Sequence, residues 1–219
     1  WLDGFVCRRK PVTVGEYLAF INDLVELGRE DEARRHRPRE RVSGTEGGDI
    51  FGRDESGRYV LVPDSDGHLW DLDWGMMCVN FPDAIAYARW FGEKTGSNWR
   101  LPSELEWEKV ARGVDGRKHP WGDHIEAGWA SRNDSSDRSP MPERVSSFSI
   151  DRSVYGVDDL GGGLRDWTCS TEDDGHSVEN GRIRDQYAGM DLERARTRVA
   201  RGPCWGDGLH YDLSTRMVD

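Results

Sequence analysis

Helical periodicity is confined to the first half of this 219-residue chain, and no other feature limits its possible folds as strongly. Capping residues followed by apolar stripes predict three helices, which begin after Thr13, Asn80 and Ser103. Glycines at positions 28 and 113 are expected to end the first and the third. From position 116 onward, Gly, Pro, Asp, Ser and Trp alternate with short extended stretches at 144–150, 165–169 and 197–202. The sequence therefore predicts an α+β fold whose second half consists of strands and long loops.

The chain shows no internal division at the sequence level. Segment 29–56 is highly charged, which is typical of a solvated helix tail followed by a loop. There is no internal repeat, and no stretch is rich enough in Pro or Ser to act as a linker. We expect a single domain over residues 1–219.

The charge balance limits the kinds of partner. Acidic residues outnumber basic ones by 41 to 30, which gives a formal net charge of −11. This sign opposes binding to the phosphates of nucleic acid and to anionic membranes. The longest apolar runs are far shorter than the ~20 residues that span a bilayer. We expect a cytoplasmic protein without nucleic-acid or membrane partners, whose ligand is a protein or a small molecule.

The cysteines occur singly along the chain, at Cys7, Cys78, Cys169 and Cys204. They include no Cys-x-x-Cys pair and have no histidine at zinc-finger spacing, so we do not expect a structural zinc site. Free cysteines are commonly buried as small apolar residues. Buried free thiols are therefore favoured over disulfides.

Seven segments carry a family resemblance, and they occur in the family's order at 9–17, 83–90, 99–108, 120–122, 155–157, 159–167 and 198–205. Together they resemble the formylglycine-generating enzyme family, also called the sulfatase-modifying-factor domain. The resemblance implies a C-type-lectin-like fold with little regular secondary structure. The family's usual first strand, with Gly-x-Phe-x-Met-Gly-Ser, and its closing Gly-Phe-Arg strand are not recognisable here. The charged insert after the first helix and segment 111–117 look most like copies fused behind bacterial serine/threonine protein kinases, which implies a kinase domain in the same chain.

The resemblance places the family's catalytic centre after a turn that reads Gly202-Pro203-Cys204-Trp205 here. Catalytic members oxidise a substrate cysteine to formylglycine with oxygen and a copper ion held by two cysteines. Those two positions fall on Asp207 and Asp212 in this chain. Soft thiolates stabilise Cu(I), whereas carboxylates suit hard metals. We therefore expect neither copper nor formylglycine formation by the family mechanism.

The same segment supplies the candidate ligand-binding residues, which are Cys204, Trp205, Asp207, His210, Tyr211 and Asp212. A polar loop exposed to solvent is the simpler interpretation. A hard-metal or iron site formed by Asp207, His210 and Asp212 is an alternative. Cys204 is either a reactive thiol or metal ligand, or a small residue packed under Trp205.

The resemblance also implies structural calcium, held partly by a Gly-Asn-Val-Trp-Glu-Trp segment. That segment reads Gly162-Gly163-Leu164-Arg165-Asp166-Trp167 here, so Gly163 replaces the asparagine and Asp166 the glutamate. A second calcium-binding asparagine aligns with Ser131. Because calcium takes 6–8 oxygen ligands, these losses predict at most a weakened calcium site at Gly163 and Asp166.

Three functions are compatible with these observations. The first is a non-catalytic ligand-binding or sensory domain within a bacterial signalling protein. The second is a metal-dependent oxidoreductase of the wider superfamily, which includes sulfoxide synthases. The third is a variable protein of a diversity-generating retroelement that binds a target through its C-terminal surface, where residues 213–219 depart from the family pattern.

Overall fold

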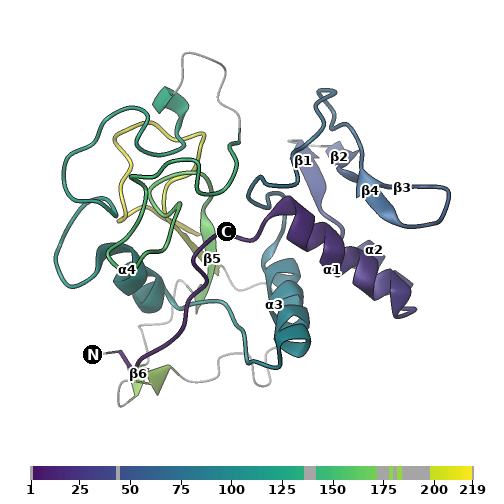
Figure 1. Cartoon of the computed structure of the whole chain (residues 1–219), viewed down its shortest axis with the longest axis horizontal. Coiled ribbons are helices and arrows are strands. Elements are labelled where there is room, and N and C mark those ends of the chain that lie inside the picture. The colour runs from purple at the N-terminus through teal and green to yellow at the C-terminus, as the bar shows by residue number, and fades with distance from the viewer. Residues whose placement is uncertain are drawn as a thin grey trace. The chain divides into compact units, whose positions relative to one another are not determined.

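The computed structural model places helices at the three positions that the capping residues predict. It describes residues 2–42, 45–135, 142–171, 178–179, 182–183 and 198–218. Figure 1 shows these residues as helices, short strands and long irregular segments. The chain divides into two compact units, one formed by Val12–Arg100 and the other by Trp1–Pro11 with Leu101–Asp219.

The unit Val12–Arg100 is built around two capped helices, α1 (Val14–Glu26) and α3 (Phe81–Thr95). Thr13 and Asn80 each form a full capping box with the acidic residue three positions later. The unit also contains α2 (Glu30–Arg35), β1 (Arg39–Val42), β2 (Thr45–Asp49), β3 (Phe51–Arg53) and β4 (Tyr59–Leu61). β1 pairs antiparallel with β2, and β3 pairs antiparallel with β4.

The structure corrects the expectation of a loop over segment 29–56. This segment contains α2 and the strands β1, β2 and β3. Its few apolar residues explain the difference, because Ala33, Ile50 and Phe51 are fully buried and join the core with Phe20 and Ile21 of α1. Charge dominates the composition of the segment, but burial of these three side chains fixes its path.

The second unit contains α4 (Glu104–Arg112), the 3₁₀ turn η1 (Asn133–Ser135) and an antiparallel sheet. The sheet has the order β5-β8-β9, from β5 (Asp166–Thr171), β8 (Arg198–Arg201) and β9 (Arg216–Val218). β6 (Val178–Glu179) and β7 (Arg182–Ile183) form a separate pair. Two of the predicted extended stretches are therefore strands. The third, 144–150, forms turns instead, because Ser146 adopts a positive φ and donates its N–H to Asp159.

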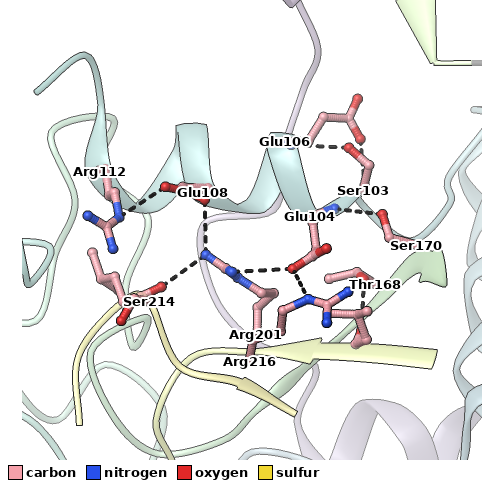
Figure 2. Close-up of polar contacts among 12 residues, drawn as sticks. Ser103, Glu104, Glu106, Glu108, Arg112, Thr168, Ser170, Arg201, Ser214 and Arg216 are labelled. Carbon is pink, nitrogen blue, oxygen red and sulfur yellow. Dashed lines mark hydrogen bonds and ion pairs between the residues drawn. The ribbon is translucent and has the colours of Figure 1, made fainter. Parts of the chain in front are cut away.

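A buried ion network joins α4 to the sheet (Figure 2). Glu104 accepts from Arg201 of β8 at 3.3 Å and from Arg216 of β9 at 2.8 Å. Arg201 also donates to the carboxylate of Glu108 and to the backbone oxygen of Leu213. The network fixes both ends of the segment between β8 and β9, residues 202–215, which we call the β8–β9 loop.

All four cysteines are free, as the sequence predicts. Cys169 is buried and Cys204 is half-buried, but Cys7 and Cys78 are exposed, so the expectation of burial fails for these two. None of the helices in the described ranges combines the length and the hydropathy that a membrane-spanning segment requires.

Candidate functional site

The β8–β9 loop holds all six predicted ligand-binding residues. It opens with a tight turn in which the Asp207 N–H donates to the Cys204 carbonyl at 2.9 Å. The Asp207 side chain closes the same turn, since its Oδ2 accepts the Cys204 N–H at 2.8 Å. The Trp205 N–H donates to the Gly163 carbonyl at 2.9 Å, which ties the turn to the segment before β5.

Asp207 is a buried partner of Arg165. The guanidinium Nη2 lies 2.6 and 2.7 Å from the two oxygens of Asp207, and Nη1 donates to the Cys204 sulfur at 3.1 Å. Asp207 is only 8% exposed. Hydrogen bonds between charged groups of this kind are short and strong. Both oxygens of the carboxylate are therefore engaged within the protein.

Sequence reasoning missed Arg165, although a signal was present. In the alignment that the resemblance implies, Arg165 takes the place of the motif's tryptophan and Asp207 the place of a cysteine. The two departures introduce opposite charges. Opposite charges that replace two motif residues are a reason to expect an internal ion pair, and the structure brings them together.

The surroundings of Cys204 disfavour its thiolate. Burial raises the pKa of Cys204 above its usual value, although the Arg165 charge acts in the opposite direction. A reactive cysteine needs a lowered pKa, because the thiolate is the nucleophile and the metal ligand. The net direction of the shift therefore disfavours the thiolate of Cys204, even with Arg165 beside the sulfur.

Asp212 is engaged in a second local turn. Its Oδ1 accepts the Ser214 N–H at 2.7 Å and also the Ser214 hydroxyl. Partial burial acts to raise the pKa of Asp212, but the Ser214 hydrogen bonds outweigh it and the pKa is lowered. Asp207 and Asp212 lie in the same loop but have different partners. Asp207 contacts Arg165 and Cys204, whereas Asp212 contacts Ser214.

His210 and Tyr211 are the exposed members of the candidate set. Their ring centroids lie 4.3 Å apart, and Tyr211 is 36% exposed. Within the described part of the chain, no three His, Cys, Asp or Glu side chains converge in a way that could hold a metal ion. Asp207, His210 and Asp212 are therefore close in sequence without forming a three-ligand centre.

The donor set does not fit the family's copper ion. A bis-thiolate centre needs two soft donors, and the two corresponding positions carry carboxylates that are bonded to Arg165 and Ser214. Cys204 is the one thiol in the β8–β9 loop, and its sulfur accepts from Arg165.

The residues at the expected calcium position do not fit that ion either. Asp166 Oδ2 accepts the indole N–H of Trp107 at 2.7 Å, and burial raises the pKa of Asp166 to about 6. Gly163 offers no side chain, and its backbone is bonded to Ser131 and Trp205. The two segments that the resemblance assigns to calcium do meet, but through backbone hydrogen bonds.

Arg132 is the second functional residue that sequence reasoning missed. It is 4% exposed and reaches the β8–β9 loop, where Nη1 donates to the Gly208 and Tyr211 carbonyls. Its Nε donates to the Gly161 carbonyl at 2.7 Å. A single arginine in a loop-rich segment gives no signal of such burial, because the acceptors are backbone atoms.

Comparisons with known proteins show the family of the chain. The family model for the sulfatase-modifying factor enzyme 1-like domain matches residues 1–218. The hercynine oxygenase of Mycolicibacterium smegmatis is 30% identical over 178 residues, which cover 77% of this chain and 38% of the relative. The inactive C-alpha-formylglycine-generating enzyme 2 of Mus musculus is 31% identical over 145 residues, which cover 62% of this chain and 39% of the relative. The chain thus spans less than two-fifths of the length of these relatives.

A solved structure shows the same fold. PvdO from Pseudomonas aeruginosa superposes with a TM-score of 0.57 at 24% identity, over 96% of this chain and 72% of that one. The helices, the small sheet and the long irregular segments are those of a C-type-lectin-like fold with little regular secondary structure. On its sequence and its fold, this chain belongs to the sulfatase-modifying factor enzyme 1-like domain family, the family of the formylglycine-generating enzymes.

Proposed function

We propose that this chain is a non-catalytic binding domain on the formylglycine-generating scaffold. The observation that carries the proposal is the Arg165–Asp207 ion pair. It occupies one of the two positions that hold copper in the family, and it uses both carboxylate oxygens. Breaking this part-buried pair would leave the charge of the buried Asp207 carboxylate uncompensated, which disfavours rebuilding the position as a metal ligand.

The exposed part of the β8–β9 loop supplies the binding surface. His210 and Tyr211 present neighbouring rings to solvent, next to a turn that Arg165 and Asp207 hold in place. Aromatic rings on a fixed backbone contribute large contact areas at a low cost in conformational entropy. A protein segment or a small molecule with an aromatic or apolar group fits this chemistry.

A family precedent and the length of the relatives support a role inside a larger protein. The mouse relative is named as an inactive formylglycine-generating enzyme 2. The curated relatives are more than twice as long as the matched region. The sensory role that we propose is therefore that of one domain attached to a signalling protein, such as a serine/threonine kinase.

Catalysis can be tested directly with purified protein. We expect no aldehyde in a cysteine-containing sulfatase-type peptide incubated with copper, oxygen and this chain, while an active formylglycine-generating enzyme run in parallel converts it. Hydroxylamine-reactive aldehyde detected by mass spectrometry would overturn the proposal. Stoichiometric iron in protein purified without chelator would instead support the oxidoreductase alternative.

Binding can be tested with a library of aromatic fragment molecules, followed by NMR of the histidine and tryptophan side chains. We expect fragments that bind to shift the His210 and Trp205 signals. In His210→Ala the Trp205 signal should no longer shift, while in the control His124→Ala, which removes another exposed histidine of the same unit, the His210 and Trp205 signals should still shift. Fragments that shift only signals outside the β8–β9 loop would contradict this location.

A further inference from the structure

Three segments of the second unit meet at one buried cation. Arg132 follows Ala130 and Ser131, and its guanidinium donates to Gly161 from the segment before β5. The same guanidinium donates to Gly208 and Tyr211 of the β8–β9 loop. All three acceptors are backbone carbonyl oxygens.

The surroundings of Arg132 are arranged for a positive charge. Burial lowers the pKa of Arg132, and the carboxylates of Asp151, Asp207 and Asp212 act against that effect. Arginine nevertheless remains protonated in proteins. A buried charge is costly unless it is compensated, and here the carbonyl oxygens of Gly161, Gly208 and Tyr211 compensate it at Nε and Nη1, while Nη2 has no hydrogen-bond partner among the described residues.

The backbone around this cation is closely packed. Gly163 donates to the Ser131 carbonyl at 2.8 Å. A Cβ atom at Gly162 would lie 2.5 Å from the same oxygen, so only glycine fits there. Segments 130–132 and 161–163 are therefore in direct contact, and Arg132 extends this contact to the β8–β9 loop.

This arrangement matches what a calcium ion does in other sites. Calcium gathers backbone carbonyls and carboxylates from separate loops into one cluster. The residues present do not supply its ligands, since Asp166 is bonded to Trp107 and Gly163 has no side chain. A guanidinium, in contrast, has N–H donors in several fixed directions, so it can bind carbonyl oxygens from separate loops without an ion from solution.

We propose that Arg132 is the built-in cation of this unit, and that it positions the β8–β9 loop without a bound metal. The guanidinium takes over the loop-gathering role of a divalent ion. Arg132 is thus a positioning residue for the loop that carries His210 and Tyr211. This inference concerns how the loop is ordered and holds whether or not the proposed binding function is correct.

The test combines metal addition with hydrogen exchange. We expect the melting temperature of the wild-type protein to be unchanged by EDTA and by excess Ca²⁺, because Arg132 already supplies the cation. Arg132→Lys keeps the positive charge but loses the planar guanidinium with its several N–H donors, and Arg132→Met loses both the charge and the donors. Amides of residues 204–213 should exchange at least about tenfold faster in Arg132→Met than in the wild type, with Arg132→Lys between them.

Arg152 provides the matched control. It is an arginine of the same unit that pairs with the carboxylate of Asp158 rather than with loop carbonyls. Arg152→Met should leave exchange of the β8–β9 loop unchanged. Equal exchange in Arg132→Lys and Arg132→Met would show that the charge has no role. A rise in the wild-type melting temperature on adding Ca²⁺ would show that the unit still uses a metal, and either result overturns the proposal. Should Arg132→Met fail to fold, unchanged loop exchange in Arg132→Lys would overturn it as well.

Discussion

His119 lies in an environment that disfavours its protonated form. It is 3% exposed, and its ring stacks on Trp121 with 5.2 Å between centroids. Its Nδ1 has no hydrogen-bond partner within the described residues. Burial, followed by the charge of Arg132, lowers the pKa of His119 to about 4. Burial, with a smaller contribution from the charge of Arg132, therefore favours the neutral form of this histidine.

This lowered pKa makes stability depend on pH. An unfolded histidine titrates near pH 6.5, so the contribution of His119 is complete above that value and is lost as pH falls towards about 4. Between pH 7 and pH 5 the free energy of unfolding should fall by about 2 kcal/mol on account of His119. His119→Phe keeps the stacking and should remove this part of the slope in urea unfolding at the two pH values. His124→Phe alters an exposed histidine and should keep the wild-type slope. An unchanged slope in His119→Phe would contradict the assignment.

For Asp207, the sequence predicts the chemistry of the position but not the contacts of the side chain. The motif places Asp207 at a copper-binding position of the family. A carboxylate oxygen there suits Cu(I) less well than the thiolate sulfur that it replaces. The direction of its side chain depends on Arg165, which is 42 residues away in sequence. Arg132 is harder still to predict, because its partners are carbonyl oxygens that every residue has. The sequence identifies the β8–β9 loop, whereas the conformation of this loop depends on Arg165 and Arg132, which are distant in sequence.

Elements that form through local contacts are those that the sequence predicts well. Thr13, Asn80 and Ser103 each form a capping box with a residue three positions away, so the helix starts can be read from short patterns. β1, β2 and β3 arise within a charged segment, where three buried side chains decide the path. The order β5-β8-β9 depends on pairing between distant segments, which no local pattern specifies.

The junction of α4 with the sheet should depend strongly on Glu104. Its side chain is buried and accepts from both Arg201 and Arg216 (Figure 2). Glu104→Gln replaces the buried carboxylate that the two arginines share with a neutral amide, and we expect it to lower the free energy of unfolding by about 3 kcal/mol. The control Glu108→Gln alters a carboxylate that contacts the same Arg201 but is 44% exposed, and should cost less than about 1 kcal/mol. Urea titrations of both variants measure the difference, and equal losses would show that the network is not organised around Glu104.

Each compact unit has a hydrophobic core of its own. The larger core, with Phe20, Ile21 and Leu24, lies entirely within Val12–Arg100. The smaller one, with Trp107 and Leu213, lies entirely within the second unit. Cooperative unfolding units commonly follow such cores. One family domain can therefore contain two regions of different local stability.

Substitutions in the two cores should act on different parts of the molecule. Leu24 is 2% exposed and Leu213 is fully buried, so replacing either with alanine should cost about 2–5 kcal/mol through lost burial and a cavity. Peptide-resolved hydrogen exchange should show faster exchange mainly in α1 and α3 for Leu24→Ala, and mainly in α4 and the β5-β8-β9 sheet for Leu213→Ala. If either variant accelerated exchange equally in both units, the two cores would belong to one cooperative structure. Local responses would instead mean that the β8–β9 loop, anchored by Leu213, takes its stability from the second unit alone.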